Sequence, residues 1–135
     1  MNLKYLLDTN ACINYLNYPQ AKVAAAIRSV PLHEIAVCSV VKAELFFGSR
    51  KSKNPATNLG KQLQFLDQFE SLSFDDEAAN AYANIRADLT AKGTIIGPYD
   101  LQIAAIAIAN NLTLVTHNVS EFSRVAGLRI EDWEL

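Results

Sequence analysis

The sequence has few of the residues that build disulfide or zinc-bound frameworks. Its 135 residues include only two cysteines and two histidines, and none of the four shows metal-ligand spacing. We therefore expect Cys12 and Cys38 to be small buried hydrophobes, and His33 and His117 to stand alone as surface or turn residues. These shortages exclude a disulfide scaffold and argue against a zinc or redox centre.

Long apolar runs are also missing. The longest, Ile103 to Ala109, is too short to cross a bilayer. The N-terminus lacks the basic region followed by an apolar core that marks a signal peptide. We therefore expect a cytoplasmic protein that does not act on a membrane.

An excess of positive charge is absent as well. The formal net charge is −2, which argues against a protein whose whole surface binds polyanions. The charge is nevertheless uneven between residues 42 and 61, where the single acid is Glu44 and the bases are Lys42, Arg50, Lys51, Lys53 and Lys61. This basic segment either holds phosphates or forms a solvated helix end.

The pattern of apolar residues predicts one α/β domain over residues 1–135. Half of the residues are hydrophobic and no linker or repeat interrupts them, so the chain can build a substantial core. The alternation of elements predicts a three-layer fold with a mostly parallel central sheet flanked by helices. Ser39 and Asp75 are expected as N-caps, Pro98 at a first helical position and Gly93 just beyond a helix. Strands are expected at 4–7, 35–38, 72–74, 112–116 and 128–130, and helices at 9–17, 20–29, 39–51, 56–70, 76–92 and 98–110.

Three carboxylates differ from the other acids because their surroundings are apolar. Asp8 ends a strand-like run, at the position where ligands collect beside parallel sheets. Glu44 and Asp100 have only apolar residues or glycine three and four positions away. Each also has a structural interpretation: Asp8 as a helix cap, Asp100 as an acid favoured by the helix dipole, and Glu44 as the partner of a buried arginine.

Convergence of the three acids predicts a metal site. Two unit charges about 4 Å apart repel by about 4 kcal/mol at an effective dielectric constant near 20. Either a proton is shared or a divalent cation fills the space between them. Because the ligands would all be oxygen atoms, Mg²⁺ is the expected ion, with Mn²⁺ as a substitute.

Four segments in register resemble the motifs of PIN-domain ribonucleases, and more narrowly those of VapC-type toxins from bacterial toxin and antitoxin pairs. The segments are "LLDTNACI" at 6–13, "SVVKAELFFG" at 39–48, "IGPYDLQIAAIA" at 96–107 and "THNVSEF" at 116–122. The ending "GLRIEDW" at 127–133 is similar to that subgroup. The resemblance extends over nearly the whole chain and implies a PIN-like fold.

The resemblance implies roles for individual residues. Asp8, Glu44 and Asp100 become the metal-binding acids of a metal-dependent endoribonuclease, in which the metal activates water for attack on an RNA phosphodiester. The sequence departs from the family at Asn118, where many relatives have a fourth acid; Asn118 can orient water but adds no charge. Glu121 either compensates for it or lies on a solvated helix. Supporting roles fall to Thr9, Asn10 and Thr116.

The resemblance also implies partners. VapC-type relatives often cut transfer RNA, and leave a 5′ phosphate and a 3′ hydroxyl. A cognate antitoxin is expected to block the acidic pocket with an extended or helical peptide, and a homodimer is expected.

Tyr99 is expected to pack under its loop rather than to stack on a base. Candidate RNA-binding residues are Arg50, Lys51, Lys53, Arg86 and Lys92; amphipathic segments available for partners are 20–30 and 59–69.

Two other functions remain as alternatives. A catalytically degenerate PIN fold could serve as a binding or scaffold module if Asn118 abolishes metal binding. A phosphoacceptor receiver domain has similar length and acids at strand ends. That fold expects a second acid beside the first-strand carboxylate, whereas Thr9 and Asn10 follow Asp8. Calorimetric titration with metal would separate an enzyme from a scaffold.

Overall fold

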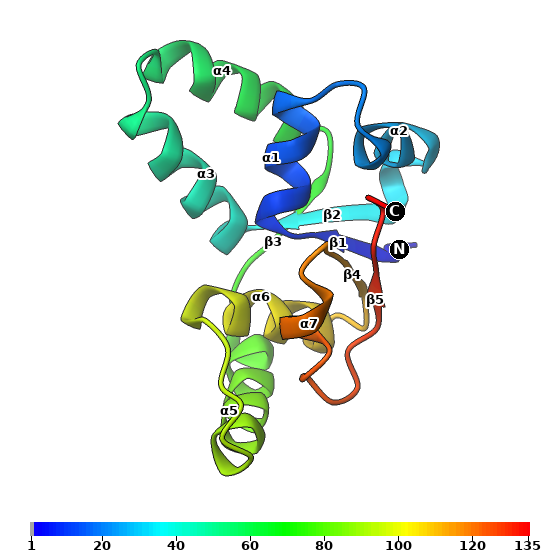
Figure 1. The fold of residues 1–135 in the computed structure, drawn as a ribbon, viewed down its shortest axis with the longest axis vertical. Helices are drawn as coiled ribbons and strands as arrows, with labels where there is room; N and C mark the ends of the chain where they lie inside the picture. Colours follow the sequence, from blue (N-terminus) through cyan, green and yellow to red (C-terminus); the bar gives the residue numbers. More distant parts are fainter. Residues whose placement is uncertain (1) are drawn as a thin grey trace.

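The computed structural model describes residues 2–135 and contains a five-stranded sheet between two layers of helices (Figure 1). All neighbouring strands are parallel and follow the order β3-β2-β1-β4-β5. The predicted three-layer α/β fold is therefore confirmed, and the sheet is parallel throughout. The strands are β1 (Tyr5–Leu7), β2 (Ile35–Cys38), β3 (Glu70–Leu72), β4 (Thr113–Val115) and β5 (Ile130–Glu131).

The helices divide between the two sides of this sheet. One layer contains α1 (Thr9–Asn17), α2 (Lys22–Ser29), α3 (Ser39–Lys51) and α4 (Pro55–Leu66) (Figure 1). The other contains α5 (Asp76–Ala91), α6 (Pro98–Ala109) and α7 (Val119–Phe122). Within residues 2–135, no helix combines the length and the apolar character needed to span a bilayer.

The core lies around β1, β2 and β4, which are covered on both faces. Leu6, Leu7, Val37 and Leu114 are fully buried, as is typical of strands inside a parallel sheet. Helix α6 is apolar on nearly every side because it packs between α5 and the sheet. The two cysteines are also buried, as the sequence predicted.

The order of the strands positions the functional edge. After β1, the chain adds β2 and β3 on one side, then returns to add β4 and β5 on the other. The carboxyl ends of β1 and β4 therefore flank the point where the strand order reverses, which is where open parallel sheets bind ligands. Asp8 follows β1 directly, and Thr116 to Asn118 follow β4.

Several predicted boundaries and one predicted cap are wrong; α2 and β5, for example, each begin two residues later than predicted. Helix α4 ends at Leu66 rather than at residue 70, and β3 covers 70–72 rather than 72–74. Pairing of Glu70 with Ala36 of β2 creates this edge strand, which its polar sequence does not indicate. Ser39 is the first helical residue instead of the N-cap, because β2 runs directly into α3 through Cys38. The cap at Asp75, the proline at the start of α6 and the positive φ of Gly93 agree with the prediction.

Candidate active site

Asp8 lies at the sheet edge with its side chain almost fully buried. Its N–H donates to the carbonyl oxygen of Val115 at 3.1 Å, which joins the ends of β1 and β4. Its Oδ1 accepts from the N–H of Ala11 at 2.8 Å and so caps α1. The interpretation of Asp8 as a helix cap is therefore correct. The capping hydrogen bond also orients the carboxylate beside Thr116, whose hydroxyl lowers the pKa of Asp8 and so favours its charged form.

Glu44 reaches the same edge from the second turn of α3. Its Oε1 accepts from the hydroxyl of Thr9 at 2.6 Å. Thr9 therefore links the start of α1 to α3 and restricts the rotamers of Glu44. The contact places Thr9 beside Glu44, whereas Asn10 is exposed; the supporting roles of both residues stay predictions.

Asp100 and Glu121 meet at the start of α6. The N–H of Gly97 donates to Glu121 Oε1 at 3.1 Å, and a Cβ atom placed on Gly97 would lie 3.6 Å from Asp100 Oδ2. The proximity of Glu121 raises the pKa of Asp100, first through its charge and then through a side-chain contact that favours protonated Asp100. Asn118 completes this group, since its Nδ2 donates to Glu121 Oε2 at 2.8 Å. Glu121 therefore lies beside Asp100 and remains partly exposed.

The electrostatics of the pocket reflect burial and negative charge. The pKa of Asp8 is raised to about 6, mainly by burial and to a smaller extent by the negative charges of Glu134 and Glu44. Burial also raises the pKa of Asp100 to about 6, followed by the charges of Glu121 and Glu44. Hydrogen bonds from Asn118 and Gly97 lower the pKa of Glu121.

No base forms an ion pair with these carboxylates in the part of the chain that the structure describes, although the charge of Arg124 contributes to the lowered pKa of Glu121. The ion pairs there are Lys4–Glu34, Lys92–Asp88 and His117–Asp132. The interpretation of Glu44 as the partner of a buried arginine is therefore wrong. Carboxylates without an ion-pair partner, from four different segments, form an oxygen-only donor set, which fits a hard divalent cation. We name the group of Asp8, Glu44, Asp100 and Glu121 the acidic pocket.

A second group lies beside the acidic pocket and joins the turn after β4 to the C-terminal tail. His117 Nδ1 lies 2.9 Å from Asp132 Oδ2, so the prediction that His117 stands alone is wrong. Among residues 2–135, His117, Asp132 and Glu134 are the one trio of potential ligands whose atoms all lie within 4.8 Å of one another. No trio from the acidic pocket meets this distance limit among the described residues. Sequence reasoning missed Asp132 and Glu134, although "GLRIEDW" contains the first of them.

The candidate RNA-binding bases occupy two separate places. Arg50 and Lys51 end α3, and Lys53 follows in the turn before α4. Arg86 lies on α5 in the other helical layer, where its Nη1 donates to the hydroxyl of Tyr82 at 3.0 Å (Figure 1). The structure therefore groups the first three bases and separates Arg86 from them.

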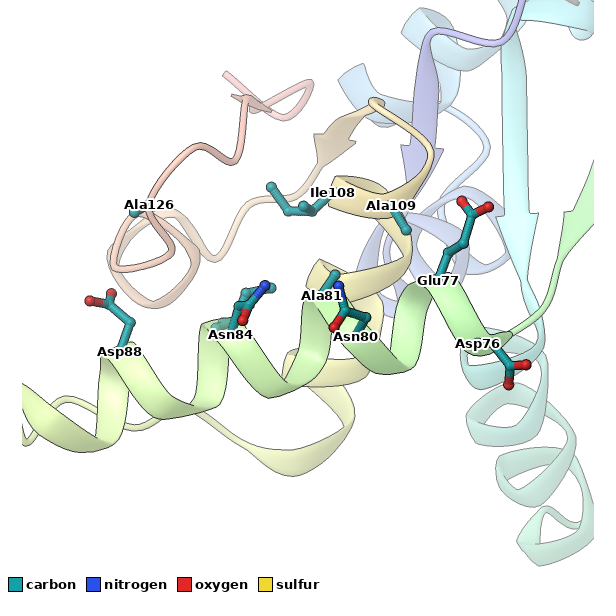
Figure 2. A pocket seen from close by; sticks show the side chains of 10 residues that line it. Asp76, Glu77, Asn80, Ala81, Asn84, Asp88, Ile108, Ala109 and Ala126 are labelled. Carbon is teal, nitrogen blue, oxygen red and sulfur yellow. The ribbon is translucent and has the colours of Figure 1, made fainter.

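A groove beside α5 is the wrong environment for a polyanion. It has a volume of about 680 Å³, and Asp76, Glu77 and Asp88 extend from α5 along it (Figure 2). No lysine or arginine lines it. RNA phosphates are therefore expected at the sheet edge and not in this groove.

Comparison with known proteins identifies the family. The PIN domain model matches residues 5–128. The chain belongs to the PIN-domain family. This PIN protein is 38% identical to the tRNA(fMet)-specific endonuclease VapC of Salmonella typhimurium over 131 residues, which are 97% of this chain and 98% of that relative. It is 40% identical to ribonuclease VapC2 of Rickettsia felis over 131 residues, which are 96% and 98% of the two chains.

Solved structures agree with this assignment. The crystal structure of DNA-bound VapBC from Salmonella typhimurium matches with a TM-score of 0.92 at 38% identity, and the match covers 97% of this chain and 98% of that one. VapBC-5 of Mycobacterium tuberculosis, a member of the VapBC family of toxin-antitoxin systems, matches with a TM-score of 0.71 at 27% identity and 97% coverage of both chains. The resemblance to VapC-type PIN ribonucleases is therefore confirmed, and the receiver-domain alternative is wrong.

The pKa shifts of the PIN protein predict how its stability depends on pH without metal. The carboxyls of Asp8 and Asp100 titrate near pH 6 when folded but have an ordinary pKa of 3.8. The folded state then holds protons that the unfolded chain has released, so stability falls as pH rises from about 4 to 6. The pKa of His117, raised by Asp132, acts in the same direction. In EDTA, the melting temperature should be higher at pH 5 than at pH 7.5.

The substitution Asp8→Asn provides the control for this pH dependence. It removes one of the two carboxyls with a raised pKa, so the difference in melting temperature between pH 5 and pH 7.5 should shrink. The lowered pKa of Glu121 affects stability only below about pH 4.5, outside the range from pH 5 to pH 7.5. A melting temperature that rises between pH 5 and pH 7.5 would contradict the raised pKa values.

Proposed function

We propose that this PIN protein is a metal-dependent endoribonuclease toxin that cleaves structured RNA and thereby inhibits translation. Transfer RNA is the proposed substrate class, and a cognate antitoxin neutralises the enzyme. The observation that carries the proposal is the acidic pocket, whose four carboxylates form no ion pair among residues 2–135 and lie at the reversal point of a VapC-type sheet. Asp8, Glu44, Asp100 and Asn118 are the proposed catalytic residues.

The side chains of the pocket suit Mg²⁺, with Mn²⁺ as a substitute. Asp8, Glu44 and Asp100 are the proposed ligands. When bound, the ion would lower the pKa of water, favour in-line attack on the phosphodiester and neutralise charge on the phosphoryl oxygens. Thr9 holds Glu44 through its hydroxyl, and Thr116 lies against Asp8. Both residues therefore fix the direction of a carboxylate, which keeps the donor set in place.

Asn118 positions Glu121 within this site. Its amide hydrogen bond favours the ionised form of Glu121, and its own N–H donates to Thr116 Oγ1 at 3.0 Å. Glu121 thereby places a fourth negative charge beside Asp100, although position 118 itself is neutral. We infer that Glu121 compensates for the missing acid.

A groove between helices provides the proposed antitoxin site. It lies between α1, α2 and α4, has a volume of about 620 Å³, and includes Tyr15, Leu16 and Phe65. Both amphipathic segments expected to serve partners contribute to it, through Arg28 and through Phe65. An amphipathic peptide can bury an apolar face in such a groove. We further propose that the protein acts in the cytoplasm as a homodimer.

The proposed activity is tested by sequencing RNA ends after brief induction of the protein without its antitoxin. Cleavage should produce new 5′ phosphate and 3′ hydroxyl ends at a few positions in structured RNA. The matched control is the Asp100→Asn variant produced at the same level. Ends that carry a 2′,3′-cyclic phosphate would contradict hydrolysis by activated water, because they require the RNA 2′-hydroxyl as nucleophile.

The basic end of α3 gives a prediction about RNA affinity. Replacing Arg50, Lys51 and Lys53 together with Ala should weaken RNA binding and reduce the slope of log affinity against log salt by about 2 to 3, because up to three phosphate contacts are lost. Metal affinity should not change, since none of the three pairs with the acidic pocket among residues 2–135. An unchanged slope, measured by fluorescence anisotropy from 50 to 300 mM salt, would show that these bases do not contact RNA.

Variants at Asn118, together with metal titration of the wild-type protein, test whether the protein is an enzyme or a degenerate binding module. Asn118→Ala should slow cleavage at least tenfold, about the effect of losing a group that orients a ligand, while the tightest metal affinity stays nearly intact. Asn118→Asp should tighten metal binding because it adds a carboxylate to the donor set, and in EDTA it should lower the melting temperature because it repels Glu121. Calorimetric titration with Mg²⁺ or Mn²⁺ measures both affinities. A wild-type protein that binds neither ion would favour the scaffold alternative.

A further inference from the structure

An apolar groove lies beside the acidic pocket, between α3 and the start of α6. It has a volume of about 510 Å³ and its lining includes Val40, Ala43, Glu44, Phe47 and Tyr99. Glu44 belongs both to this groove and to the acidic pocket. Any molecule that fills the groove therefore lies next to the proposed catalytic residues.

The two aromatic side chains of the groove are exposed rather than packed. Phe47 is 62% exposed and Tyr99 is 58% exposed. The expectation that Tyr99 packs under its loop is therefore wrong. Exposed aromatic faces cost free energy in water, and their location beside a functional site suggests that a ligand covers them.

The charge around the groove favours a ligand with both an apolar face and an anionic group. Lys51 Nζ lies over one face of the Phe47 ring, 4.8 Å from its centroid, so a cation covers that face and the opposite face is the one available to a ligand. Tyr99 lies in the first turn of α6, whose free N–H groups attract negative charge. Gln102 and Ser39 add hydrogen-bonding groups to the lining.

An unpaired nucleotide of RNA combines these properties. Its base has two π faces and polar edges, and its phosphate is anionic. The volume of the groove lies within the range of about 300–1,000 Å³ typical of sites for small molecules. A nucleotide in the groove would also direct its neighbouring phosphate toward Glu44.

We propose that Phe47 and Tyr99 form a stacking site for one unpaired base of the RNA substrate, adjacent to the bond that is cleaved. This inference rests on the proposed ribonuclease function and makes it more specific: the substrate needs a splayed base beside the cleavage site. Lys51 contacts the phosphate of that nucleotide. Recognition of an unstacked base gives sequence or loop preference to a surface that otherwise contacts backbone.

The test compares the loss of the base with the loss of the aromatic side chains. A single-stranded RNA that the wild-type protein cleaves is prepared in versions that each lack one base, and the KM and kcat of every version are measured. With wild-type protein, base removal at one position next to the cleavage site should raise KM about tenfold, as for other base–aromatic stacks. With Phe47→Ala and Tyr99→Ala combined, intact RNA should show the same increase, and base removal should add little.

Matched variants separate stacking from other effects. Tyr18 is 61% exposed and lies outside the groove, so Tyr18→Ala should leave KM unchanged. Phe47→Trp keeps an aromatic face and should preserve KM, whereas Phe47→Leu keeps only apolar bulk and should raise it. Equal effects of Trp and Leu would overturn the proposal.

Two further outcomes are decisive. If the double variant is a monomer where the wild-type protein is a dimer, by sedimentation at the assay concentration, the groove is a contact between copies and the stacking proposal is overturned. If base removal and side-chain removal have independent effects that multiply, the base lies elsewhere. A wild-type protein that cleaves RNA but shows no sensitive base contradicts only the stacking site, whereas a wild-type protein that cleaves no RNA contradicts the proposed function itself.

Discussion

Replacing Asp8 with Asn should reduce the rate of RNA cleavage at least about 100-fold, with saturating Mg²⁺, and the same result is expected for Glu44→Gln and Asp100→Asn. Each substitution removes a proposed metal ligand. The expected fall in activity is therefore larger than the 10- to 100-fold typical of residues that only orient the ligands through hydrogen bonds. The metal-free variants should be as stable as the wild type or more stable, because each removes one charge from a repulsive group. Asn at position 8 can still accept the hydrogen bond that caps α1.

The control for these variants is Asp88→Asn. Asp88 belongs to an exposed ion pair with Lys92 on α5, so the change should alter stability by less than about 1 kcal/mol and leave cleavage intact. Wild-type cleavage by any of the three active-site variants would remove that residue from the site. A clear fall of the melting temperature in EDTA would indicate a structural role for the carboxylate instead.

Replacing Phe122 with Ala should lower the free energy of unfolding by about 3–5 kcal/mol. Phe122 is 1% exposed and belongs to the main core, so truncation leaves a cavity that the surrounding side chains fill only in part. It also directly follows Glu121 in α7, and loss of its packing should let that carboxylate move away from Gly97. Denaturant unfolding measures the first effect, and metal titration below the melting temperature measures the second.

Phe47→Ala is the matched control for Phe122→Ala, because it truncates the same type of side chain at an exposed position. Because Phe47 is 62% exposed, its truncation should change the free energy of unfolding by no more than about 0.5 kcal/mol. Similar losses at positions 47 and 122 would mean that the groove beside α3 is buried in solution, for example by a second copy of the chain.

The elements with strong local signals were predictable from the sequence. The bounds of α1 and α3 agree with the prediction because a strand end and a helix start adjoin in each case. Strand β3 was misplaced because its polar side chains carry no alternating pattern, and only pairing with β2 makes it a strand. Tertiary contacts therefore decided the elements that local sequence leaves ambiguous.

The residues of the candidate site were likewise predictable only where the local sequence is informative. Apolar neighbours singled out Asp8, Glu44 and Asp100 without knowledge of the fold. Glu121 could not be assigned from its neighbours, because its approach to Gly97 spans 24 residues of sequence. The tail was missed for the same reason: Glu134 accepts from Asn14 Nδ2 across 120 residues, and no local pattern predicts a contact at that separation.

The outer strands of the sheet restrict how two copies of the protein can associate. Strand β3 has three residues and β5 has two, so each edge offers a neighbouring chain few free N–H and C=O groups. Short edges are a common protection against strand-to-strand aggregation. We therefore expect concentrated solutions of the protein to resist fibre formation, and any paired state to join helical surfaces instead of extending one sheet across two molecules.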